Sequence, residues 1–81
     1  GAPDLPLAAK ILYVADLVEP TRDYKGVKAL RRTAAGPDLD AAVLHGADII
    51  LKHLIRKGRT IDPRTVDMRN SLLDAGVRYE K

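Results

Sequence analysis

The chain has 81 residues, of which 46% are hydrophobic and 31% charged, and its formal net charge is +3. This length and balance fit one small globular domain or part of a larger one, and they argue against a disordered or collagen-like chain. The sequence has no cysteine, which excludes disulfides and thiolate metal sites. No apolar run reaches the roughly 18 residues that a membrane span needs, and no basic stretch precedes an apolar one at the start, so we expect a cytoplasmic protein without a secretory signal.

The material for a hydrophobic core is limited. The chain has no Trp, no Phe and three Tyr, so a core must be built mainly from Leu, Ile, Val and Ala. A domain of this size buries a modest share of its surface, and we expect a stability of about 5 kcal/mol at best. This is a first sign that the chain belongs to something larger.

The first predicted helix covers about residues 5–18. Asp4 is the expected N-cap, Pro6 fits the first turn, and Pro20 ends the helix, because a residue before proline avoids the helical region. Apolar residues lie almost all round this helix. Such helices occupy the middle of a fold, so we expect this one to be central.

Three more helices are predicted, over about residues 27–34, 38–57 and 63–75. Asp38 and Asp62-Pro63 are helix-start signals, and Gly58 and Gly76 are helix-end signals. The expected inward residues of these helices are Val27, Leu30, Leu39, Ala42, Val43, Ala47, Ile50, Leu54, Val66, Met68, Leu72 and Leu73. We expect residues 77–81 to be frayed. No alternating strand pattern or hairpin signal occurs, so the predicted class is an all-α helical bundle, with residues 1–81 forming one unit.

Asp16 lies in ILYVADLVEP, the most apolar stretch of the chain. An isolated carboxylate in an apolar interior costs several kcal/mol unless it is paired, protonated or bound to a metal. Glu19 lies three positions later at a helix C-terminus, where negative charge is unfavourable. Two such acids predict an external cation, which is either Arg22 or a metal ion.

Two interpretations of Asp16 remain open at this point. It faces a wet edge and pairs with Arg22 or Arg69, or it is a metal ligand. His45 and His53 are eight residues apart and do not form a ligand pair, so we expect them to be surface or half-buried histidines. A basic run follows, and its four residues are Lys25, Lys28, Arg31 and Arg32. Such runs are mostly solvated faces, although they can also attract an anionic substrate.

Residues 11–31, ILYVADLVEPTRDYKGVKALR, carry the pattern Tyr-x-Ala-Asp-x-x-Glu-Pro-x-Arg followed by Gly-Val and Leu-Arg. This segment resembles the YqeK family of HD-domain phosphohydrolases. Downstream, DLDAAVLHGADIILKHLIRKG and IDPRTVDMRN resemble the C-terminal helices of the same family, in the same order. The resemblance covers nearly the whole chain.

The resemblance implies a bacterial hydrolase that cuts diadenosine tetraphosphate symmetrically into two ADP at a pair of divalent metal ions, with iron the expected metal. It implies that Asp16 is a metal ligand and that Glu19, Thr21 and Arg22 bind substrate, with the Arg22 guanidinium contacting phosphate. Arg69-Asn70 matches the family pattern, and we interpret it as a structural pair.

The family's other ligands, a His, a His-Asp pair and further His residues, precede the region that this sequence covers, and Asp62 stands where the family commonly has His. We therefore expect the chain to be the C-terminal half of an HD domain. Its partners would be the missing N-terminal half and a dinucleoside polyphosphate, and the 81 residues alone would be inactive.

Two alternatives belong to other function classes. One is a small basic helical module that binds nucleic acid, although no predicted helix carries basic and amide residues along one face at its start. The other is a structural domain whose first helix associates with a protein partner or with a second copy of the chain.

Overall fold

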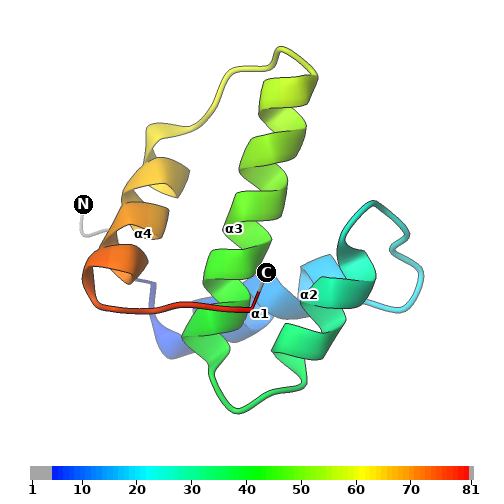
Figure 1. The fold of residues 1–81 in the computed structure, drawn as a ribbon, viewed down its shortest axis with the longest axis vertical. Coiled ribbons are helices and arrows are strands. Elements are labelled where there is room, and N and C mark those ends of the chain that lie inside the picture. The colour runs from blue at the N-terminus through cyan, green and yellow to red at the C-terminus, as the bar shows by residue number, and fades with distance from the viewer. Residues whose placement is uncertain (1–4, 81) are drawn as a thin grey trace.

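The computed structural model describes residues 5–80 as four α-helices (Figure 1). In chain order these are α1 (Leu7–Val18), α2 (Val27–Ala34), α3 (Leu39–Arg56) and α4 (Pro63–Asp74). No β-strand occurs in this part of the chain, so the predicted all-α bundle is confirmed. Asp4, the expected cap of the first helix, lies outside the described residues. Within residues 5–80, no helix meets the length and hydropathy that a bilayer crossing demands.

The boundaries of α3 and the start of α4 follow the predicted signals, whereas α1 begins at Leu7, so Pro6 takes the N-cap position and not the predicted place in the first turn. The Asp38 carboxylate accepts a hydrogen bond from the Ala41 amide (3.2 Å), and the Asp62 carboxylate accepts one from the Arg64 amide (3.0 Å). Both therefore satisfy donors that the first turn of a helix leaves free. Gly58 follows α3 in the left-handed conformation (φ 65°), which glycine adopts without strain.

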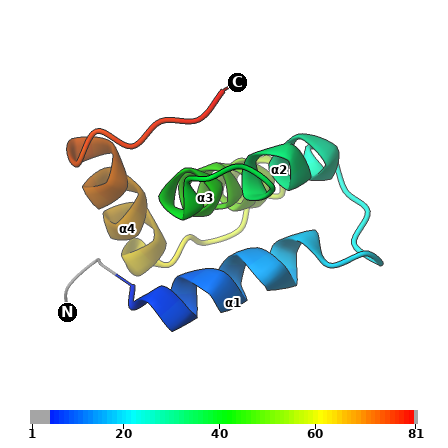
Figure 2. The same ribbon diagram turned by 90° about the horizontal axis from the view of Figure 1, so that it is seen from below.

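The central helix is α3, and the expectation that the first helix would be central is wrong. Figure 2 shows α1 on one side of α3, with α2 and α4 on its flanks, and α3 contacts all three. Every residue from 41 to 48 is buried. By contrast, Leu7, Ile11 and Leu12 of α1 are 68%, 52% and 72% exposed.

Small residues explain why α3 is the enclosed helix. A Cβ atom added at Gly46 would lie 2.7 Å from Leu17 Cδ1, so α1 approaches α3 where α3 has no side chain. Ala41, Ala42 and Ala47 are likewise buried, and they let the other helices come close. α1 has larger side chains and buries mainly the face that carries Val14.

The C-terminal tail is packed, so the predicted fraying is wrong for its described residues. The tail crosses α3 on the side opposite α1 (Figure 2). Val77 and Tyr79 are half-buried and pack against the core cluster. The tail therefore extends a core that the four helices alone would leave open.

Tyr13 provides a test of the packing between α1 and α3. Its hydroxyl is buried without a hydrogen-bond partner among the described residues. Since an unsatisfied buried polar group costs about 1–3 kcal/mol, we expect Tyr13→Phe to raise the free energy of unfolding by about 1 kcal/mol in urea denaturation.

The same residue predicts a pH dependence. Burial raises the pKa of Tyr13 from 10.0 to about 12, because it disfavours the phenolate. The unfolded chain therefore loses this proton first, and stability should fall between pH 10 and 12. Tyr13→Phe should reduce this alkaline loss. An unchanged alkaline profile, or a variant less stable than the parent at pH 7, would contradict the burial of an unpaired hydroxyl.

Candidate functional site

The predicted site residues come together at the C-terminal end of α1. A shallow, open depression there is lined by Asp16, Glu19, Thr21, Arg22, Asp23 and Tyr24. All four of the residues predicted to bind metal or substrate are among them. The structure thus places on one surface the four side chains to which the family resemblance assigns metal or substrate binding.

Asp16 is not embedded in an apolar interior, so that expectation is wrong. Its side chain is 71% exposed, and its carboxylate lies 3.5 Å from Arg22 Nη2. α1 packs on α3 through the face that carries Val14, and Asp16 lies on the opposite side of the helix. Leu12, one turn earlier on the same face as Asp16, is also exposed, at 72%. Asp16 therefore pairs with Arg22 at a solvent-exposed edge, as one of the two interpretations of the sequence expected. Its role as a metal ligand stays a prediction.

Side chains of the loop after α1 and of α2 donate hydrogen bonds to the free carbonyl groups at the end of α1. The last four carbonyl groups of an α-helix have no partner within the helix. Those of α1 belong to Asp16, Leu17, Val18 and Glu19. Arg22 Nε donates to the Asp16 carbonyl (3.1 Å), and the Tyr24 hydroxyl donates to the Leu17 carbonyl (2.6 Å). Arg31 donates to the Val18 carbonyl through Nε (3.1 Å) and to the Glu19 carbonyl through Nη2 (2.9 Å).

Pro20 explains why side chains, and not backbone amides of a glycine cap, donate to the carbonyl groups at the end of α1. It prevents the helix from continuing, and Glu19 adopts an extended conformation (φ −56°, ψ 151°) instead of a left-handed glycine cap. The chain then turns back, with the Arg22 amide donating to the Glu19 carbonyl (3.0 Å). The spacing of the Glu-Pro-x-Arg segment therefore has a structural cause in this chain, because it returns basic and hydroxyl side chains to the helix end.

Arg31 was expected on a solvated face, but it is half-buried and turned toward this loop. Besides its bonds to the end of α1, its Nη2 donates to the Arg22 carbonyl (2.8 Å). One residue of the basic run therefore donates hydrogen bonds within the fold and does not simply face solvent. Sequence reasoning missed this role, because the helical spacing of α2 alone does not place Arg31 against the preceding loop.

The charge of the depression suits a cation better than an anion. Three carboxylates and one guanidinium line it, from Asp16, Glu19, Asp23 and Arg22. The Thr21 hydroxyl donates to the Glu19 carboxylate, and this bond holds the pKa of Glu19 below its ordinary value, with smaller contributions from Arg22 and Arg31. Glu19 is therefore ionised at neutral pH, and a polyphosphate would meet negative charge here without an intervening cation.

The expected metal pair can be tested against these donors. Carboxylate oxygens suit hard divalent ions, so Asp16 has the right chemistry. However, residues 5–80 contain no group of three or more His, Asp or Glu side chains that could hold a metal ion. The described residues fit the metal in donor type and supply too few ligands to hold it alone.

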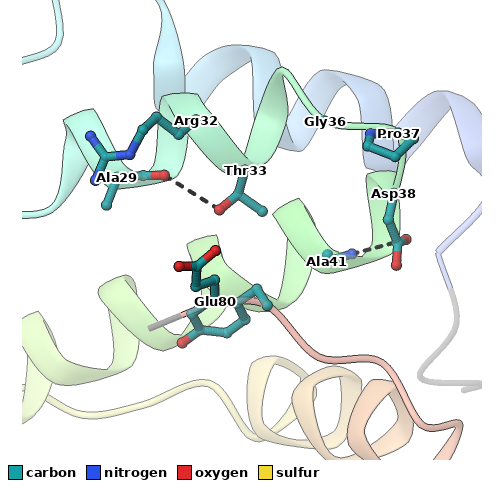
Figure 3. Close-up of a pocket in the computed structure, with 9 residues that line it drawn as sticks. Ala29, Arg32, Thr33, Gly36, Pro37, Asp38, Ala41 and Glu80 are labelled. Atoms are coloured by element: carbon teal, nitrogen blue, oxygen red, sulfur yellow. Dashed lines mark hydrogen bonds between the residues drawn. The ribbon is translucent and has the colours of Figure 1, made fainter.

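A second hollow lies on another part of the molecule. This cleft has a volume of about 550 Å³ and lies between the end of α2, the start of α3 and the tail (Figure 3). Thr33 and Arg32 line it from α2, and Glu80 of the tail points toward them. None of the predicted site residues lines it, so it is separate from the Asp16 depression.

A buried polar network beside this cleft was not predicted. Asp48 is 8% exposed and accepts hydrogen bonds from Arg69 Nε (2.5 Å) and from the Tyr79 hydroxyl (2.5 Å). Tyr79 stacks on His45, with ring centroids 4.1 Å apart, and His45 Nδ1 lies 2.9 Å from the Thr33 hydroxyl. His45 is 8% exposed, so the expectation of a surface or half-buried histidine is wrong, whereas His53 is exposed as expected.

This network ties α4 and the tail to α3. Burial lowers the pKa of His45 from its ordinary value, and burial, with the hydrogen bond to Asp48, raises the pKa of Tyr79. Arg69 does not reach Asp16, and its pairing with Asp48 supports the structural interpretation of Arg69. We assign the network to stability and not to the candidate site.

The chain is similar to two known enzymes over most of its length. The chain is 36% identical over 73 residues to the symmetrical bis(5'-nucleosyl)-tetraphosphatase of Halalkalibacterium halodurans. It is 34% identical over 65 residues to the enzyme of the same name from Bacillus subtilis. These alignments cover 90% and 80% of this chain but only 38% and 34% of the relatives, so the chain spans little more than a third of their length.

The resemblance predicted from the Ala-Asp and Glu-Pro-x-Arg residues is therefore confirmed as a similarity over most of this chain. No family model matches the sequence, and no solved structure matches it.

Proposed function

We propose that the full-length protein carrying this sequence hydrolyses diadenosine tetraphosphate symmetrically to two ADP. The similarity to two symmetrical tetraphosphatases is the observation that carries this proposal. In such a reaction water attacks one of the two central phosphorus atoms. The bond from that atom to the central bridging oxygen breaks, and the oxygen leaves with the second ADP.

The depression at the end of α1 supports a role for this chain in that reaction. Arg22 is about half exposed (49%), so its guanidinium can reach a phosphate while Nε stays bonded to the end of α1. Thr21 and Glu19 form a bonded pair beside it and can orient the polyphosphate or a nearby water molecule. A guanidinium binds phosphate oxygens in a fork, which gives direction as well as charge.

We propose that Asp16 is one ligand of a divalent metal pair, with iron the expected metal, and that the remaining ligands come from outside these 81 residues. The metal would neutralise phosphate charge and lower the pKa of a bound water. Leu12, one turn before Asp16 on the same face of α1, is 72% exposed, and this apolar side chain supports the proposal that further protein covers this face.

A product assay tests this function. The full-length protein, incubated with diadenosine tetraphosphate and a divalent metal, should yield ADP as the only nucleotide product. The 81 residues alone should be inactive, because they supply one proposed ligand. ATP plus AMP as products would contradict symmetrical cleavage, and robust hydrolysis by the 81 residues alone would contradict an incomplete site.

A further inference from the structure

The guanidinium of Arg31 joins two pieces of backbone that belong to the candidate site. It donates to the Val18 carbonyl (3.1 Å) and the Glu19 carbonyl (2.9 Å) at the end of α1. It also donates to the Arg22 carbonyl (2.8 Å) in the loop. Three acceptors from two segments therefore converge on one side chain, although no residue of α2 lines the depression.

We propose that Arg31 is the positioning residue of this site, which fixes the place of the Arg22 guanidinium relative to the Asp16 carboxylate. This rests on the proposed function, because it assumes that Arg22 contacts the polyphosphate of the substrate. Arg31 itself touches no substrate in this proposal and acts through the backbone of Arg22.

The helix that carries Arg31 is packed on the core. Arg31 follows Leu30, which is completely buried (0% exposed), and Val27 of the same helix is 3% exposed. α2 is thus fixed on the core, and Arg31 transmits that position to the loop. Without it, the carbonyls of Val18 and Arg22 would lose their side-chain donor and the Glu19 carbonyl would keep only the Arg22 amide, so the loop would have more freedom around the position of Arg22.

Lysine cannot replace this arrangement. Arg31 uses Nε for one acceptor and Nη2 for two others, which requires the planar, branched guanidinium. A lysine ammonium is a single point and cannot span the same acceptors. Arg31→Lys therefore keeps the charge and removes the geometry, which separates positioning from long-range electrostatics.

The experiment is a double-mutant cycle on the full-length protein, with inorganic tripolyphosphate as the probe and calorimetric binding in the presence of a divalent metal as the readout. We expect Arg31→Lys to weaken binding about tenfold, and Arg22→Ala to weaken it at least as much. If Arg31 acts through Arg22, the double variant should bind no more weakly than Arg22→Ala alone. Arg32→Lys is the matched control, since Arg32 is on the same helix but lines the other cleft, and it should bind as the parent does.

Several results would overturn the proposal. These are parental binding by Arg31→Lys, multiplication of the two effects in the double variant, or no binding of tripolyphosphate by the parent. If the parent binds the probe and the cycle is non-additive but no ADP is formed from diadenosine tetraphosphate, the proposed function fails and the positioning role stands.

Amide hydrogen exchange keeps the test decisive if Arg31→Lys is less stable. The positioning role predicts faster exchange in residues 19–24 with unchanged exchange in α3. Faster exchange throughout α3 would show that Arg31 supports the whole fold, and it would overturn a role specific to this site.

Discussion

Replacing Asp16 by Asn in the full-length protein should reduce the rate of ADP formation from diadenosine tetraphosphate by about a thousandfold or more, because a neutral amide oxygen binds a divalent metal more weakly than a carboxylate and does not offset its charge. The fold should be unaffected. The Asp16 side chain is 71% exposed, and its pairing with Arg22 is long, at 3.5 Å. Exposed ion pairs of this kind contribute about 0–1 kcal/mol, so thermal unfolding should change little. The measurement is the initial rate at saturating substrate, beside a thermal melt.

A matched control separates this effect from a general loss of negative charge. Asp67 is exposed on α4, far along the chain from the depression, and Asp67→Asn makes the same chemical change. It should keep the parental rate. Full activity in Asp16→Asn would remove Asp16 from the site, whereas a collapse of the melting temperature would show a structural role that its exposure does not suggest.

The order and type of the helices could be predicted because local signals determine them. Pro20 ends α1, Gly58 follows α3 with positive φ, and Asp62 with Pro63 starts α4. Each signal acts through the backbone of its own neighbours, so no knowledge of tertiary structure is needed. The central position of α3 could not be predicted in this way, because it depends on how closely other helices approach Gly46.

The four predicted site residues lie together and their roles stay predictions, whereas the contacts that hold them in place could not be predicted. The resemblance grouped Asp16, Glu19, Thr21 and Arg22, and the structure brings them to one depression. The bonds from Tyr24 and Arg31 to the end of α1 span 7 to 13 residues in sequence. Helical periodicity carries no information on such pairs, since they depend on the path of the loop between two helices.

Asp48, and not Asp16, is the aspartate whose burial among apolar residues requires a cation. Asp16 has apolar neighbours in sequence, but its face of α1 is exposed. Asp48 follows the buried Ala47 and precedes the buried Leu51 on the enclosed helix. Asp48 has the closer cation, Arg69, at 2.5 Å, whereas the exposed Asp16 lies 3.5 Å from Arg22. Apolar neighbours in sequence thus indicate burial only when the helix is enclosed, and burial creates the need for a partner.

Asp48→Ala is therefore expected to lower the free energy of unfolding by about 2–3 kcal/mol, which is near half of the roughly 5 kcal/mol expected for a domain of this size. The change leaves the Arg69 guanidinium and the Tyr79 hydroxyl without the acceptor that both use. Arg69 is 35% exposed and can partly turn to water, which limits the loss. Urea denaturation of the 81-residue chain measures it.

Two further variants determine whether the network, and not the aspartate alone, provides this stability. Tyr79→Phe removes one donor and keeps the ring stacked on His45, so it should cost about 1 kcal/mol. Asp67→Ala, at an exposed position of α4, should change stability by less than about 0.5 kcal/mol. A loss below about 1 kcal/mol in Asp48→Ala would mean that the carboxylate is solvated in the folded chain. In that case the tail would not be held on α3 by the Tyr79 hydroxyl, and stacking and the contacts of Val77 would have to hold it instead.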